Sequence, residues 1–220
     1  MSVSADPLLL FSEKSGTYDR FIHATGYPRG LRAYFERSGL LRPGLHVLDA
    51  GCGTGVVTLA VHDACLRRGF APPLTHAFDL TPAMLDRFRR TLGSRGITQI
   101  ELAQADVLAL GQLPSAWDDY DLVVSASMME YLPRTKLPDA LRGLRGRLRP
   151  DGTLILFITR RNWLTRPLIG RWWQSNLYTA DELRVAFRDA GFATAAFRRF
   201  PFPFHYLDSW GYIVEASARA

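Results

Sequence analysis

The chain has 220 residues, of which 47% are hydrophobic and 22% are charged, so its composition predicts one folded domain and excludes a disordered chain. Its apolar runs, such as residues 154–158, are far shorter than the ~20 residues of a membrane-spanning helix. Residues 1–10 lack the basic start of a signal peptide. The chain has only two cysteines, and Cys52 lies in a glycine-rich segment, so no structural disulfide is expected. No cysteines and histidines have the spacing of metal ligands, so no metal site is expected either. We therefore expect a cytoplasmic protein.

Arginine gives the chain its net charge of +6, because Lys14 and Lys136 are the only lysines. A basic balance is compatible with nucleic-acid binding and with an ordinary solvated surface, and the scattered arginines favour the surface. The densest run, residues 142–149, falls on a helix predicted to end at Arg149-Pro150, where cations are favourable. We expect no nucleic-acid partner.

Hydrophobic periodicity and breaker residues predict a helical start followed by alternating strands and helices. Two short helices, 18–25 and 30–37, are separated by Gly26-Tyr27-Pro28 and form a helical cap within residues 1–40. After residue 40, strands are predicted at 46–50, 74–78, 100–105, 122–126, 153–159, 193–200 and 211–216, and helices at 56–68, 82–92, 137–148 and 179–190.

The ends of the later elements carry local signals. Thr179 and Glu182 have capping-box spacing at the start of the last helix, and Gly191 follows its end. Asp151-Gly152 predicts a turn before the strand at 153–159. Alternation of strands with helices predicts an α/β fold with a mostly parallel sheet covered on both faces. Residues 41–220 are expected to form one domain beneath the cap.

A glycine loop follows the first strand. Asp49 precedes three glycines at alternate positions, Gly51, Gly53 and Gly55, and a helix begins directly after them. A helix N-terminus suits a carboxylate or a phosphate, whereas a carboxylate at Asp49 disfavours a pyrophosphate and suits an ammonium group. The G-x-G-x-G spacing also differs from the G-x-G-x-x-G of dinucleotide folds. A zwitterionic amino-acid tail fits both features.

The sequence Val-Leu-Asp-Ala-Gly-Cys-Gly-Thr-Gly at 47–55 resembles the first motif of the class I S-adenosylmethionine-dependent methyltransferases. The resemblance, which extends over residues 45–217, implies a Rossmann-like, doubly wound, seven-stranded, mostly parallel sheet with an antiparallel last strand. It also implies that the methionine part of S-adenosylmethionine is held by Asp49, Ala50, Gly51 and Gly53.

Two further motifs match the family in order. Asp79, at the end of the second strand, corresponds to the acid that binds the cofactor ribose, and Leu80 and Met84 would flank the adenine. Asp106 corresponds to an acid near the adenine amino group, with Val107 packing on the ring. A solvated loop aspartate is the alternative for Asp106.

The fourth matching segment, residues 120–132, resembles the fourth strand and the loop that lines the junction of cofactor and substrate. Ser125 is assigned to the cofactor site on this basis. Glu130 and Tyr131 stand where many relatives have histidines, a departure from the family pattern, but they lie near the expected methyl position, so we expect them to act in catalysis by orienting the substrate. The segment lacks the Asn/Asp-Pro-Pro-aromatic signature of enzymes that methylate exocyclic amines of bases. Amino methylation in DNA is therefore not expected.

No catalytic base follows from the motifs. His23 and His205 are candidates because histidine titrates near neutral pH, although a lone histidine is often structural. Tyr18 is a candidate contact for the methionine carboxylate, with stacking in a helix pair as the alternative. Aromatic residues gather in 11–35, 160–174 and 200–206, which indicates a planar or hydrophobic substrate if they do not simply pack the cap on the core.

The sequence thus predicts methyl transfer from S-adenosylmethionine, leaving S-adenosylhomocysteine, to an O, N or C atom of a hydrophobic or aromatic small molecule by in-line displacement. One alternative is a lipid-like substrate such as a prenylated quinone, because tryptophans, leucines and arginines at 163–173 suit a membrane surface, although Pro167 and Gly170 interrupt a helix there. The others are an NAD(P)-dependent oxidoreductase, which fits the glycine spacing and Asp49 less well, and an RNA-binding module, which explains only the charge.

Overall fold

The computed structural model describes residues 22–163, 165 and 175–219. Helices and strands alternate along the chain as the periodicity predicts. The helices are α2 (Tyr27–Arg37), α3 (Val56–Arg67), α4 (Pro82–Ser94), α5 (Leu137–Arg145) and α6 (Ala180–Asp189), and the strands are β1 (His46–Ala50), β2 (Leu74–Asp79), β3 (Ile100–Gln104), β4 (Tyr120–Ala126), β5 (Leu148–Thr159), β6 (Thr194–Arg198) and β7 (Gly211–Ser217).

The strands form one seven-stranded sheet in the order β3-β2-β1-β4-β5-β7-β6. The pairs from β3 through β5 are parallel, whereas β7 runs antiparallel to both β5 and β6. This confirms the predicted α/β fold with an antiparallel last strand. The chain leaves β1 towards β2 on one side and later returns to β4 on the other, so a topological switch point lies between β1 and β4.

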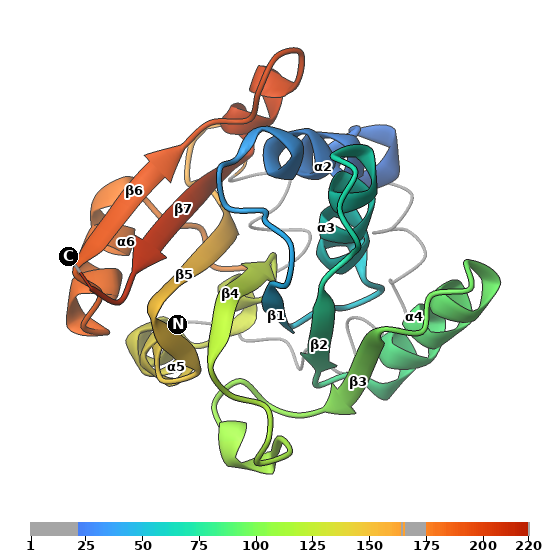
Figure 1. The fold of residues 1–220 in the computed structure, drawn as a ribbon. Coiled ribbons are helices and arrows are strands. Elements are labelled where there is room, and N and C mark those ends of the chain that lie inside the picture. The colour runs from blue at the N-terminus through green and yellow to red at the C-terminus, as the bar shows by residue number, and fades with distance from the viewer. Residues whose placement is uncertain (1–21, 164, 166–174, 220) are drawn as a thin grey trace.

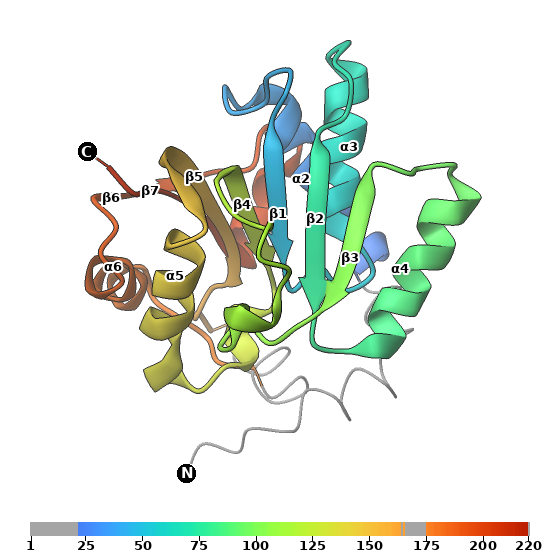
Figure 2. The same ribbon diagram turned by 60° about the horizontal axis from the view of Figure 1, so that its bottom comes forward.

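Helices cover both faces of the sheet (Figures 1 and 2). On one face, α5 buries Leu137, Ala140, Leu141 and Leu144, whose spacing of three and four residues forms a single apolar stripe, and packs with α6 on the central strands. On the other face, Leu31 and Phe35 of α2 pack with α3 against residues that include Val124 and Phe157. The proposed boundary between cap and domain at residue 40 stays a prediction.

One predicted helix end is wrong. The helix predicted to reach residue 148 stops at Arg145, and residues 148–159 form a single strand that contains the expected turn at Asp151-Gly152. The pairing of β4 with β5 jumps from Tyr120–Leu148 to Leu122–Thr153, which marks a bulge. Gly152 is needed there because a Cβ would lie 2.7 Å from the Tyr120 carbonyl oxygen.

The break expected at Gly26-Tyr27-Pro28 is instead the beginning of a helix. Gly26 is the N-cap of α2 with φ 71°, and Pro28 lies in the first turn, where its missing N–H costs nothing. Of the helix predicted at 18–25, residues 22–25 fall within the described part of the chain; residues 22–24 are helical and Thr25 lies in a turn. No described helix combines the length and the apolar character needed to cross a bilayer.

Candidate active site

The glycine loop has a backbone that only glycine adopts easily. Gly51, Gly53 and Gly55 have φ values of 74°, 53° and 89°, all left-handed. A Cβ at Gly51 would overlap the Met128 side chain, and one at Gly55 would overlap the Phe88 ring. The alternating glycines therefore let the loop turn sharply while neighbouring side chains close over it.

The loop lines one wall of an open cleft of about 1040 Å³, which we call the cofactor cleft. The cleft lies at the carboxyl ends of β1, β2 and β4, the edge where ligands bind in open parallel sheets. Its lining contains nine of the residues singled out from the sequence: Asp49, Gly51, Gly53, Asp79, Leu80, Met84, Asp106, Val107 and Tyr131. Segments far apart in the sequence thus converge where the motifs require.

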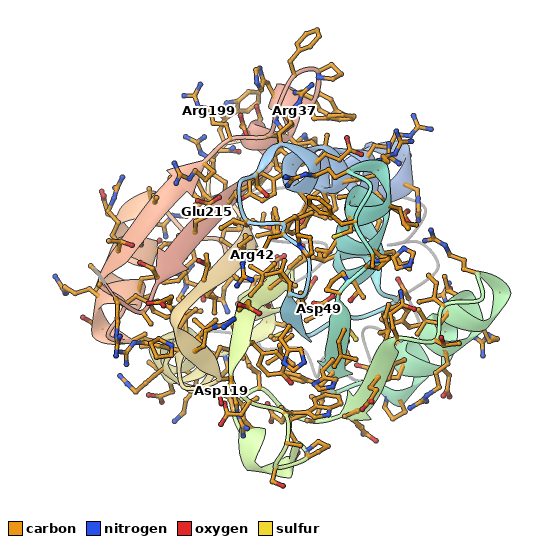
Figure 3. All side chains as sticks on the ribbon, in the orientation of Figure 1. Arg37, Arg42, Asp49, Asp119, Arg199 and Glu215 are labelled. Carbon is orange, nitrogen blue, oxygen red and sulfur yellow. The ribbon has the colours of Figure 1, made fainter. Side chains whose placement is uncertain are left out.

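Asp49 is a buried carboxylate on β1 among the central strands (Figure 3). Its Oδ2 accepts hydrogen bonds from the Thr58 backbone N–H at 3.1 Å and from the Thr58 hydroxyl at 2.5 Å, whereas Oδ1 has no hydrogen-bond partner. Burial, helped by the nearby Asp79 charge, raises the pKa of Asp49 to about 7. An orphaned carboxylate oxygen in a ligand cleft fits a cationic group, because buried polar atoms are normally paired.

Asp79 ends β2 with its carboxylate fixed from both sides. Oδ2 accepts from the Gly53 N–H at 2.8 Å and Oδ1 accepts from the Thr81 N–H at 2.8 Å. Burial raises the pKa of Asp79. A carboxylate oxygen can accept two hydrogen bonds, so each oxygen of Asp79 could accept a further bond from one of two vicinal hydroxyls.

The remaining predicted cleft residues surround a space suited to a planar ring. Met84 and Val107 are buried and Leu80 is partly exposed, so they supply apolar walls. Asp106 accepts a hydrogen bond from the Leu108 N–H at 2.8 Å, which braces its side chain at the cleft. This cleft position is compatible with the adenine-amine role and with a solvated loop aspartate, so the role stays a prediction.

Ala50 and Ser125, which were predicted as cofactor contacts, are not among the residues that line the cleft, so their role stays a prediction. Both are fully buried, and the Ser125 hydroxyl donates to the Ala50 carbonyl at 2.8 Å. This bond ties β4 to β1 behind the wall of the cleft. The sheet packing that buries these two residues is not revealed by the local sequence.

A second cavity of about 720 Å³ lies beside the cleft, and we call it the aromatic pocket. The two cavities share Ile22, Tyr27, Ser127 and Tyr131 in their linings. The pocket is lined by six aromatic rings, those of Tyr27, Tyr131, Phe157, Phe200, Trp210 and Tyr212. Trp210 and Tyr212 were not predicted, because only the pairing of β7 with β5 brings them to the site.

Glu130 lines this pocket while almost fully buried. Its Oε2 accepts from the Thr159 N–H and its Oε1 from the Thr159 hydroxyl, each at 2.9 Å. Burial raises the pKa of Glu130 to about 7, although both hydrogen bonds oppose the rise. Thr159 was not predicted either, and no local signal marks it, since it lies 29 residues further along the chain.

The two histidine candidates lie away from both cavities. His205 is exposed and its ring packs near Phe202, with ring centroids 6.5 Å apart. His23 is exposed and lines a separate, arginine-rich surface hollow. Neither lines the cleft or the pocket, so neither is retained as a catalytic base. Tyr18, and all of 163–173 except Trp163 and Thr165, lie outside the described residues.

The doubly wound sheet, the glycine loop at its switch point and the ordered acids define a Rossmann-like protein whose cleft suits a nucleoside joined to an amino acid. Comparison with known proteins agrees, because residues 47–152 match a family model described as a methyltransferase domain. This match places a methyltransferase domain at residues 47–152, the part of the chain whose motifs resemble those of the class I S-adenosylmethionine-dependent methyltransferases. It agrees with the predicted methyltransferase and gives no support to the alternative of a nicotinamide-dependent oxidoreductase.

Two curated relatives are also methyltransferases. The malonyl-[acyl-carrier protein] O-methyltransferase of Anoxybacillus flavithermus is 29% identical over 128 residues, covering 57% of this chain and 42% of that protein. The chloroplastic 2-methyl-6-phytyl-1,4-hydroquinone methyltransferase 1 of Oryza sativa subsp. japonica is 28% identical over 189 residues, covering 83% of this chain and 52% of that protein. The chain thus spans about half of these relatives or less.

A solved structure shows the same fold over the full length. Magnesium protoporphyrin IX methyltransferase from Synechocystis PCC 6803, with S-adenosylmethionine bound, superposes with a TM-score of 0.64 at 18% identity. The match covers 98% of this chain and 99% of that one. At this identity the likeness concerns the fold alone.

Proposed function

We propose that this chain transfers a methyl group from S-adenosylmethionine in the cofactor cleft to an apolar or aromatic small molecule in the aromatic pocket. The observation that carries the proposal is the wall common to both cavities, formed by Ile22, Tyr27, Ser127 and Tyr131. A donor in the cleft and an acceptor in the pocket would meet at this wall. The family match and the two methyltransferase relatives support the reaction class.

The cleft residues fit the cofactor part by part. Asp49, with its unpartnered Oδ1, would hold the ammonium, and the glycine loop would approach the methionine backbone closely. Asp79 would hold the ribose hydroxyls, Leu80, Met84 and Val107 the adenine ring, and Asp106 its amino group. When bound, the cofactor supplies a methyl group already activated on a sulfonium.

The residues of this chain contribute mainly by alignment. Holding two reactants in line is worth about 7–11 kcal/mol of the barrier in favourable cases. The apolar rings of the pocket exclude water from the acceptor, and Tyr131 stands where both cavities meet. Glu130 lies within the pocket with both oxygens held by Thr159, so it would orient the acceptor without moving itself.

The rice relative supports one second candidate, a prenylated quinol, because that enzyme is named for a phytyl hydroquinone. Such a substrate would place an apolar ring in the aromatic pocket and a long apolar chain outside it. Contact with a membrane surface would follow, and it stays a prediction, as do the cytoplasmic location and the absence of a nucleic-acid partner.

Thermal unfolding in the presence of S-adenosylhomocysteine or NAD tests the cofactor assignment. We expect S-adenosylhomocysteine to raise Tm and NAD to leave it unchanged, since only a ligand that binds the folded state stabilises it. A rise with NAD alone would overturn the proposal. Transfer of label from methyl-labelled cofactor to a panel of phenols, quinols and aromatic amines then tests the reaction itself.

A further inference from the structure

The described lining of the aromatic pocket contains one acidic side chain and no basic one. Among its described lining residues, Glu130 is the only one with a formal charge near neutral pH, and no arginine, lysine or histidine accompanies it. The pocket is therefore apolar with a single negative or neutral carboxyl group.

Two described guanidinium groups contact aromatic rings without lining the pocket themselves, one on Tyr212 of the pocket lining and one on Tyr178 outside it. Arg160 stacks on the ring of Tyr212 at 5.0 Å, and Arg134 stacks on the ring of Tyr178 at 4.7 Å. Neither forms a hydrogen bond or ion pair with Glu130, whose two oxygens both accept from Thr159. Burial and these two bonds alone shift the pKa of Glu130, which agrees with the lack of a nearby cation.

This arrangement discriminates between acceptor groups by charge. A carboxylate or phosphate brought into the pocket would lose its water, find no cation and face Glu130, and burying an unpaired charge costs several kcal/mol. A hydroxyl or an amine, in contrast, donates a hydrogen bond. Each Glu130 oxygen accepts only one bond from Thr159 and keeps capacity for another.

We propose that the methyl acceptor is an aromatic molecule without negative charge, whose reacting O–H or N–H donates a hydrogen bond to Glu130, and that the pocket rejects carboxylates. The proposal rests on the proposed function and narrows its substrate class. In the reaction, the acceptor oxygen or nitrogen forms a bond to the methyl carbon while the carbon–sulfur bond breaks and its electron pair stays on sulfur. The acceptor proton passes to the Glu130 carboxylate and then to solvent.

The test uses three probes that share one ring system, 2-naphthol, 2-aminonaphthalene and 2-naphthoate. Each is titrated calorimetrically at pH 8 into the protein saturated with S-adenosylhomocysteine. We expect the naphthol and the amine to bind, and the naphthoate to bind at least about tenfold more weakly, since like charges in a binding site cost several kcal/mol. Label transfer from the cofactor to the naphthol or to the amine then identifies the reacting atom as oxygen or nitrogen.

A pair of variants assigns the discrimination to Glu130. Glu130→Gln removes the charge and should bring the naphthoate to within about threefold of the naphthol, a difference of less than 1 kcal/mol. Glu101→Gln, whose carboxylate is 63% exposed and outside the pocket, should leave the discrimination unchanged. Binding of S-adenosylhomocysteine to both variants shows that they are folded.

Equal binding of naphthoate and naphthol to the unmodified protein overturns the proposal, and so does failure of both the naphthol and the amine to bind. That comparison requires no variant, so it stands even if Glu130→Gln does not fold. Unchanged discrimination in a folded Glu130→Gln protein also overturns it. Failure of the proposed function is separate, because it appears as loss of S-adenosylhomocysteine binding in the unmodified protein.

Discussion

Replacing Asp49 by asparagine tests whether its buried carboxylate is kept for the cofactor. The substitution preserves the shape of the side chain and removes its charge. The pKa of Asp49 is about 7 in the folded protein and 3.8 in the unfolded reference, and each unit corresponds to about 1.4 kcal/mol. The ionised side chain therefore costs the unliganded protein about 4 kcal/mol of stability at pH 8.

The sign of this effect with pH follows from where the proton binds more tightly. A raised folded-state pKa means that the folded protein holds the proton better, so the cost is absent below pH 4, grows between pH 4 and 7 and is complete above pH 7. The hydrogen bonds from Thr58 favour the ionised form, and the pKa of about 7 already includes their effect. Because asparagine resembles the neutral carboxyl group, we expect D49N to be about 4 kcal/mol more stable than the unmodified protein at pH 8, and equally stable near pH 4.

Although D49N should gain stability, it should lose affinity for the cofactor. If the ammonium group requires ionised Asp49, only about one tenth of the protein is competent at pH 6, so S-adenosylhomocysteine should bind about tenfold more weakly at pH 6 than at pH 8. D49N should bind it weakly at both values. Urea unfolding gives the stabilities and calorimetry the affinities. The reasoning is refuted if D49N keeps the pH dependence of binding, or if it is no more stable at pH 8 than at pH 4 relative to the unmodified protein.

Three other substitutions test separate parts of the site. Asp79→Ala should weaken S-adenosylhomocysteine binding at least about tenfold by removing a charged hydrogen-bond acceptor, and unaltered calorimetric affinity would exclude the ribose assignment. Gly51→Ala should abolish cofactor binding and should destabilise the protein by more than the ~1–2 kcal/mol of left-handed backbone strain, because its Cβ would also clash with Met128. The control is Gly69→Ala, where φ is 76° and the surrounding space is open. In urea unfolding this control should lose only the stability that corresponds to the backbone strain. Thr179→Ala breaks the capping box of α6 and should cost about 1 kcal/mol in thermal unfolding, while a change in cofactor affinity would contradict a purely structural role.

Much of the fold was predictable because its signals are local. The strands alternate with helices that carry apolar stripes, and the capping box at Thr179 and Glu182 forms as its spacing predicts. The bulge in β5 was not predictable, since Asp151-Gly152 has the composition of a turn and its place within the sheet depends on the pairing of β5 with β4. Local sequence defines the conformation that a segment prefers, and pairing with a distant strand decides whether it is adopted.

The cofactor cleft and the aromatic pocket also differ in how far the sequence predicts them. The lining of the cofactor cleft follows strand ends, which the sequence marks with glycines and acids, so the places of Asp49 and Asp79 in the cleft were predictable from their positions and from the family resemblance. The aromatic pocket is built from tertiary neighbours, and neither Thr159 nor Trp210 carries a local sign of its role. His205 was a candidate base only because of its residue type, and it lies on the surface outside both cavities.

Both cavities contain a buried carboxylate held in the same way, by one threonine that donates its backbone N–H and its hydroxyl. Thr58 holds Asp49 and Thr159 holds Glu130. An amide hydrogen bonded to a carboxylate changes its magnetic shielding when that carboxylate gains or loses a proton. The amide resonances of Thr58 and Thr159 are therefore two built-in reporters in a ¹⁵N-labelled protein, one for each cavity, and they can follow cofactor and acceptor separately in a single NMR titration.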